Sequence, residues 1–271
     1  MIKSKLNLRI FILLFLSAYL FIHDSIADEA EDLAKQTQNP VADLISVPFQ
    51  NNTNFNLGPN NRTQNILNIQ PVIPFNLNEN WNLITRTIAP IVYQPDITSD
   101  SGGEFGLGDI NMTLFLSPKK PGKLIWGVGP IVQFPTATDK TLGTDKWAAG
   151  PSVVILTMPG NWVLGFLANN IWSFAGDNDR PDVNQFLLQY FVNYNFNGGW
   201  YLASTPINTA NWEAGDGNKW TIPLGGGGGK LLRLGPLPVN IQSQAFYNVE
   251  KPDFGPEWQL RVQVQFLFPK L

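Results

Sequence analysis

Cysteine is absent from this 271-residue chain, and its single histidine is His23. The sequence therefore offers no disulfide framework, no thiol nucleophile and no thiolate metal site. Charged residues make up 14% of the chain, whereas ordinary soluble domains carry about a quarter. The formal net charge is −3, so the composition does not favour nucleic acid as a partner.

The amino terminus has the pattern of a secretory signal peptide. Three basic residues within the first nine positions precede a hydrophobic run from Ile10 to Ile22, and small residues follow that run. A membrane anchor helix is the alternative, but these thirteen residues fall short of the roughly 20 that a bilayer requires. We predict that residues 1–27 are removed by cleavage after Ala27, and His23 leaves with them.

The closing segment, residues 258–268, alternates between apolar and polar side chains as a strand with one apolar face does. Similar segments of about ten residues recur along the chain, and transmembrane β-barrels have this pattern. The sequence predicts an all-β fold, a transmembrane antiparallel up-and-down β-barrel of about 12 strands. The predicted strands cover residues 43–50, 64–75, 81–93, 105–117, 123–135, 147–158, 161–174, 184–196, 199–207, 219–230, 238–248 and 257–268.

The connections between these segments alternate in length, as they do in outer-membrane barrels. Long connections such as 51–63 and 136–146 interleave with short ones such as 159–160, which places both termini on the periplasmic side. Residues 28–42 precede the barrel as a periplasmic or lumenal segment with a short helix. The barrel itself is expected to occupy residues 43–271 as one domain.

Tryptophan lies mostly at the ends of the predicted strands. Barrels carry aromatic girdles at both membrane interfaces, so this placement favours a membrane barrel over a secreted β-sandwich or propeller. Prolines inside several predicted strands argue against a membrane barrel, because each removes a hydrogen-bond donor from the sheet. We expect bulges or strand ends to accommodate them. The predicted girdle residues are Trp81, Trp126, Trp147, Trp162, Trp172, Trp200, Trp220 and Trp258.

Several segments resemble one family of outer-membrane barrels. They include residues 39–50 (NPVADLISVPFQ), 70–75 (QPVIPF), 219–225 (KWTIPLG) and 244–249 (QAFYNV). The chain resembles the barrel family that is named for the MetA pathway of phenol degradation, whose members often carry the names transporter or neuromedin U. The resemblance implies a barrel that passes small hydrophobic or aromatic compounds.

Polar side chains at the inward positions of the strands are expected to line the lumen. Charged members of this set would form either a constriction that selects permeants or an internal salt bridge. Without histidine in the mature chain, a serine nucleophile lacks its usual base, so we predict no enzyme activity, no catalytic residues, no metal site and no cofactor. The lumen-lining candidates are Gln70, Arg86, Asp109, Gln189, Asn193, Arg261, Gln263 and Gln265.

Two further motifs have simple explanations. The glycine run that ends at Gly229 lacks the flanking residues of a phosphate loop, and it would instead allow barrel curvature or the close approach of a lumenal segment. The acidic loop at 177–182 lacks the glycine and glutamate of a calcium loop. A solvated outer loop is favoured there, with cation bridging to lipopolysaccharide as the alternative.

The predicted location is the outer membrane of a Gram-negative bacterium, and the predicted function is a porin-like channel for passive uptake of small hydrophobic or aromatic compounds. The expected partners are outer-membrane lipid and lipopolysaccharide, the barrel assembly machinery and the solutes. The alternative is a non-conducting structural or adhesive barrel whose lumen is filled, partly by residues 28–42. The width of a barrel near twelve strands does not decide between them.

Overall fold

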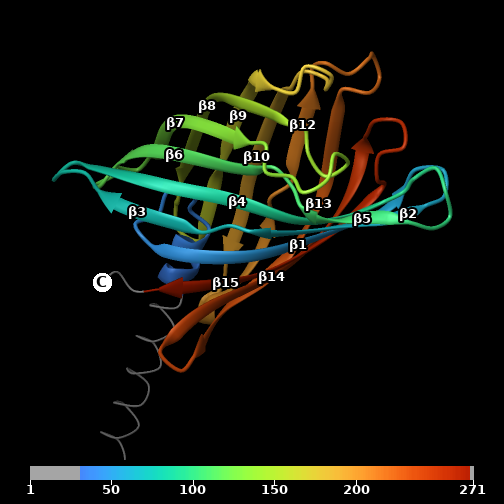
Figure 1. Ribbon diagram of the computed structural model, residues 1–271. Helices are drawn as coiled ribbons and strands as arrows, with labels where there is room; N and C mark the ends of the chain where they lie inside the picture. Colours follow the sequence, from blue (N-terminus) through green and yellow to red (C-terminus); the bar gives the residue numbers. More distant parts are fainter. Residues whose placement is uncertain (1–30, 269–271) are drawn as a thin grey trace, which may run out of the picture.

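The computed structural model describes residues 31–268, so the predicted signal peptide, residues 1–27, lies outside the described residues. The described chain forms a closed antiparallel β-barrel of twelve strands with one short helix near its N-terminus, at residues 31–37 (Figure 1). The predicted fold class is confirmed. No helix within residues 31–268 is long and apolar enough to cross a membrane.

Fifteen strand segments build the twelve strands, because three strands are interrupted. The interrupted strands are the pairs β2 and β3, β5 and β6, and β11 and β12. The segments are β1 Ile45–Leu57, β2 Arg62–Ile69, β3 Val72–Asn76, β4 Trp81–Pro95, β5 Gly103–Leu107, β6 Ile110–Pro118, β7 Ile125–Phe134, β8 Lys146–Thr157, β9 Trp162–Gly176, β10 Asn184–Asn195, β11 Trp200–Ser204, β12 Ile207–Asn211, β13 Trp220–Leu234, β14 Leu237–Glu250 and β15 Trp258–Phe268.

Each strand pairs with its neighbour in the sequence, and β1 pairs with β15 to close the ring. This last ladder runs from Ile45 opposite Phe268 to Phe55 opposite Trp258. The beginning of β1 and the end of β15 therefore lie at the same end of the barrel, which we call the terminal end. The opposite end, which carries the connections such as 96–102 and 135–145, is the loop end.

The segment at residues 51–57 corrects one prediction, because it belongs to β1 and not to a loop. Asparagine is abundant there, and asparagine favours turns. In the barrel its amides bond across to β2 instead, with Nδ2 of Asn51 donating to Oδ1 of Asn65 at 2.8 Å and Nδ2 of Asn54 donating to Gln64 at 2.7 Å. Residues 208–211 and 231–234 are likewise strand where the sequence predicts connections.

Five of the prolines inside predicted strands occupy local irregularities. Pro71 and Pro206 lie at the interruptions between β2 and β3 and between β11 and β12, and Pro223 lies beside a register shift between β13 and β14. Pro130 of β7 stands directly opposite Pro151 of β8. Two unpaired stretches of the neighbouring ladders, β6–β7 and β8–β9, flank this proline pair.

The glycine run of β13 makes room for a lumenal side chain. A Cβ on Gly229 would lie 2.4 Å from the ring of Tyr201, whose hydroxyl donates to Asn240 at 2.8 Å. Only a residue without a side chain allows the Tyr201 ring to pack against the backbone here. The group that approaches Gly229 is thus an inward side chain of the neighbouring strand β11, and not a separate lumenal segment.

Candidate functional site

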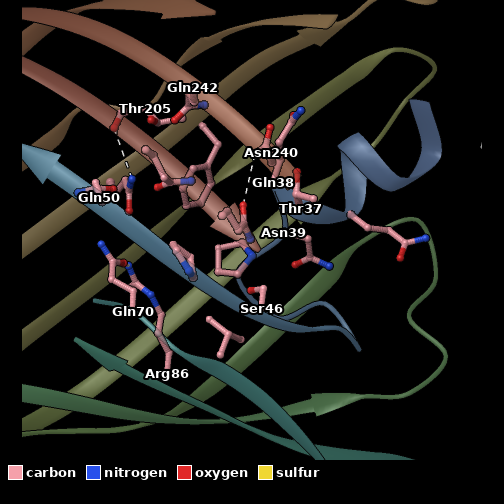
Figure 2. A pocket seen from close by; sticks show the side chains of 18 of the residues that line it. Thr37, Gln38, Asn39, Ser46, Gln50, Gln70, Arg86, Thr205, Asn240 and Gln242 are labelled. Atoms are coloured by element: carbon pink, nitrogen blue, oxygen red, sulfur yellow. Dashed lines mark hydrogen bonds between the residues drawn. The ribbon is translucent and has the colours of Figure 1, made fainter. Parts of the chain in front are cut away.

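Two cavities lie in the barrel interior. The terminal cavity, of about 120 Å³, is lined by residues 36–40 and by inward side chains of several strands (Figure 2). The loop-side cavity, of about 550 Å³, extends to the connections at the loop end, where Asn218 and Pro252 contribute to its wall. Four side chains line both cavities and form what we call the neck: Gln50, Gln70, Arg86 and Gln189.

The neck residues reach the lumen from four different strands. Gln50, Arg86 and Gln189 occupy inward positions of β1, β4 and β10, where alternation along a strand places every second side chain. Gln70 lies at the interruption between β2 and β3, and its backbone N–H donates to the carbonyl of Pro48 at 2.9 Å. Its side-chain oxygen accepts a hydrogen bond of 2.8 Å from the guanidinium of Arg86.

Arg261 is buried, and all of its hydrogen-bond acceptors among the described residues are uncharged. Its guanidinium donates to Asn52 at 3.1 Å, to the carbonyl of Thr205 at 2.8 Å and to Gln259 at 3.2 Å. Thr205 is held in turn by Gln244, whose side-chain oxygen accepts the Thr205 backbone N–H at 3.0 Å. Because Arg261 is 3% exposed and has several partners, it positions the wall near the strand interruption at Thr205.

The N-terminal segment forms the floor of the terminal cavity. Nε2 of Gln38 donates to Oδ1 of Asn195 at 2.7 Å, and Ala34 packs in an apolar cluster with Leu231 and Leu267. Val41 enters a second apolar cluster of inward side chains at the terminal end. The buried members of that cluster are Val41, Ile84, Phe115, Val154, Leu156, Val163, Leu167 and Phe191.

Asp109 serves a different purpose from the other lumen candidates. It follows the interruption between β5 and β6, and its carboxylate accepts hydrogen bonds from the backbone N–H and hydroxyl of Thr144 at 2.7 and 2.8 Å. It also accepts from the N–H of Ala137 at 3.3 Å. Asp109 therefore fastens the connection at 135–145, which Arg180 also binds through the carbonyls of Lys140 and Gly143.

The salt bridge that the sequence left open as an alternative for these charges is not present. Within residues 31–268, neither Arg86 nor Arg261 has a carboxylate within 4.0 Å. In the acidic loop, Asp182 pairs with Lys146 at 3.4 Å and Asp177 with Lys140 at 4.0 Å. No group of three or more histidine, aspartate or glutamate side chains in the described part of the chain could hold a metal ion.

Two loop aspartates are tuned by local hydrogen bonds. The hydroxyl and backbone N–H of Thr98 lower the pKa of Asp96, and Thr141 lowers the pKa of Asp139 in the same way. Each carboxylate caps its own loop as a charged acceptor. These carboxylates therefore order the loop end without entering either cavity.

Seven of the eight lumen candidates line the terminal cavity, and Asp109 does not. Gln189, Asn193 and Gln263 were predictable as lining residues, because their strands alternate regularly between apolar and polar side chains. Gln50 is a lining residue outside the predicted set, because the predicted strand 43–50 ends at it. The alternation that continues into the asparagine-rich stretch is the signal that could have identified it. Thr205 and residues 36–40 also line the cavity, and they lie at an interruption and in a non-strand segment that parity cannot assign.

The eight tryptophans that the sequence predicts as girdle residues lie at or near strand ends. At the terminal end, Trp81 and Trp126 pack edge to face with ring centres 5.8 Å apart. At the loop end, Trp258 packs against Tyr247 at 4.9 Å. Trp212 falls in the predicted connection between strands 199–207 and 219–230. In the structure it directly follows β12 and packs against Trp220 with ring centres 5.4 Å apart.

No protein-family model and no curated protein matches the sequence. Among solved structures, the chain is similar to the COG4313 outer membrane channel from Pseudomonas putida F1, with a TM-score of 0.64, 17% identity, and coverage of 83% of this chain and 94% of that one. It is also similar to the CymD monoaromatic hydrocarbon channel, at a TM-score of 0.47 and 10% identity over 89% and 92% of the two chains. A third similar structure is outer membrane phospholipase A from Escherichia coli, with a TM-score of 0.43, 14% identity, and coverage of 89% of this chain and 98% of that one. By its architecture, the chain therefore has the fold of an outer-membrane β-barrel channel.

Proposed function

We propose that this protein is a channel in the outer membrane of a Gram-negative bacterium and that it passes small hydrophobic or aromatic compounds by diffusion. The observation that carries the proposal is the pair of cavities that meet at the neck inside a closed barrel. A solute entering at the loop end would reach the neck through the loop-side cavity. The resemblance of the sequence to the MetA-pathway barrel family supports the choice of solute.

The lining of the loop-side cavity suits compounds with an apolar body. Apolar side chains from β4, β7, β9, β10 and β12 lie among amides, and binding sites for small organic molecules combine such surfaces. Amides can bond to a polar substituent while the aliphatic walls contact a ring. The apolar members are Ile88, Ile131, Ile171, Phe186, Leu187 and Ile207.

A structural or adhesive barrel with a closed lumen is the second candidate. The N-terminal segment favours it, because residues 36–40 line the terminal cavity and Val41 joins the apolar cluster at that end. In a channel, the same segment would act as a gate or a plug. In either case the outer face would contact lipid and lipopolysaccharide, and the barrel assembly machinery would insert the chain.

The two candidates are separated by conductance and uptake measurements on the refolded mature protein in lipid bilayers and liposomes. The intact chain is compared with a deletion of residues 28–42 and with Val41→Asp, which places a carboxylate in an apolar cluster and should release the segment without removing it. We expect both variants to show larger single-channel conductance and faster uptake of a small aromatic probe than the intact protein.

Each result has a distinct meaning. Conductance steps and uptake in the intact chain support an open path, and an increase in both variants identifies the segment as a gate. If neither the intact protein nor the variants pass ions or aromatic probes while the barrel is folded, the channel proposal is wrong and the structural role replaces it.

A further inference from the structure

The side chains that line the two cavities carry charge of one sign. Arg86, Arg261 and Lys219 are among them, and within the described chain no aspartate or glutamate lines either cavity. Lys219 is paired with Asp216 at 3.1 Å. Two uncompensated guanidinium groups therefore face an interior otherwise lined by amides, hydroxyls and apolar side chains.

The two arginines differ in how far the protein satisfies them. Arg261 donates to acceptors of Asn52, Thr205 and Gln259. Within residues 31–268, the one acceptor that Arg86 reaches is Oε1 of Gln70, at 2.8 Å. A guanidinium has five N–H groups in a planar fork that matches a carboxylate, so most of the donors of Arg86 have no protein partner.

The position of Arg86 adds a second, independent observation. It lies at the neck, where the terminal cavity and the loop-side cavity meet, and Figure 2 shows its side chain beside Gln70. Above it, the loop-side cavity offers about 550 Å³ with aliphatic walls that include Ile88 and Ile131. A cationic fork at the base of a partly apolar cavity matches a ligand with a carboxylate at one end and an apolar body at the other.

We propose that Arg86 binds the carboxylate of small amphiphilic acids and that the neck thereby selects organic anions over neutral compounds of the same shape. This inference rests on the proposed channel function for its biological meaning. The binding itself is a property of the neck and can be measured without transport. Gln70 keeps the guanidinium oriented. Nε2 of Gln50 and Nε2 of Gln189 each donate one hydrogen bond within the wall, to Asn52 and to Thr205, and each has a second N–H for the anion.

The test uses benzoate and its neutral isostere benzamide as probes. Binding of each to the refolded mature protein in detergent is measured by titration calorimetry in a low-chloride buffer, for wild type, Arg86→Gln, Arg86→Lys and Lys120→Gln. We expect benzoate to bind at least tenfold more tightly than benzamide. The Arg86→Gln variant should lose this preference, Arg86→Lys should keep part of it, and Lys120→Gln, which removes an exposed charge from the connection at 119–124, should keep all of it.

Equal affinity for the two probes in wild type would overturn the inference, as would an unchanged preference in Arg86→Gln. A gel-mobility assay of the folded barrel accompanies each variant, and Arg86→Lys provides the second comparison if Arg86→Gln does not fold. Ion selectivity in a KCl gradient separates this inference from the proposed function. A protein that conducts without preferring anions disproves only the selectivity, and one that binds benzoate through Arg86 but neither conducts nor takes up probes disproves only the channel.

Discussion

Arg86 and Asp109 have opposite charges and both occupy inward positions near strand interruptions, yet the barrel uses them differently. Arg86 faces the neck and has one hydrogen-bond partner in the described part of the chain, Gln70. The carboxylate of Asp109 instead accepts hydrogen bonds from backbone and hydroxyl groups of the connection at 135–145. The difference arises from distance to the loop end. Asp109 lies close enough for a folded connection to reach it, so its charge stabilises the protein itself and is not presented to a solute.

The anchoring role of Asp109 predicts local loosening in Asp109→Asn. An amide can accept at only one of its two terminal atoms, so bonds to Thr144 or Ala137 must be lost. Hydrogen bonds to a charged group contribute about 1.5 to 3 kcal/mol each. We expect faster hydrogen exchange across residues 136–146, measured by mass spectrometry of the folded barrel.

Asp139→Asn is the matched control, because Asp139 lies in the same connection and caps only its own turn at Thr141. Its exchange pattern should resemble wild type outside residues 139–142. If Asp109→Asn leaves the connection as protected as in wild type, Asp109 does not anchor it.

Strands show a similar division between regular and irregular parts. The ladder between β14 and β15 runs without a break from Val239 opposite Phe266 to Tyr247 opposite Trp258. Around Pro130 and Pro151, by contrast, prolines face each other and two adjoining ladders have gaps. Since each missing ladder bond removes about 1 kcal/mol of local stability, this patch of wall is weaker than the β14–β15 ladder on hydrogen-bonding grounds.

Amides beside the proline pair should therefore exchange faster than those of β14. A loss of about 1 kcal/mol corresponds to roughly a fivefold change. The measurement is residue-resolved hydrogen exchange of the barrel in lipid nanodiscs, with amides of Ile131 and Ser152 compared with Ile241 and Ser243. Equal protection at both places would show that side-chain packing compensates for the missing bonds.

The same contrast explains how much of the barrel the sequence could predict. Strands such as β10 and β15 have one apolar and one amide-bearing face, so alternation alone gave their extent and the inward position of Gln189 and Gln263. The predicted strand 43–50 ends too early, because the asparagines that follow favour turns in isolation and bond to β2 only once the two strands are paired. The apolar cluster that contains Val41 could not be predicted from the sequence either, because its members come from several strands that only the closed ring brings together.

The barrel formed by residues 31–268 presents many apolar side chains on its outer surface, and polar side chains line much of its two cavities. This arrangement suits a barrel in a bilayer. Adjacent residues of β15 face opposite environments: Val262 is 40% exposed on the outside, and Gln263 lines the terminal cavity. Tryptophans lie near both ends of the barrel strands, and the apolar outer surface lies between these two levels. A membrane location thus makes a specific prediction about charge tolerance.

Val262→Arg should destabilise the barrel in lipid by about 2 to 4 kcal/mol, because it places a charge on the lipid face near the middle of its strand. Gln263→Arg, one residue away, should cost much less because its side chain points into the lumen. Urea unfolding in lipid vesicles, followed by tryptophan emission, compares the two variants. Equal costs, or a larger cost for Gln263→Arg, would contradict the assignment of faces.

The pairing of β1 with β15 also sets an order of events during assembly. The contact between Asn52 and Arg261 joins residues 209 positions apart, and such long-range contacts form late because the intervening chain must first be arranged. The seat of the N-terminal segment includes Leu231 of β13 and Leu267 of β15, so it is complete only when the last strand has joined. Without β15, the ring is therefore open along the β1 edge, and the apolar cluster around Ala34 lacks one of its members.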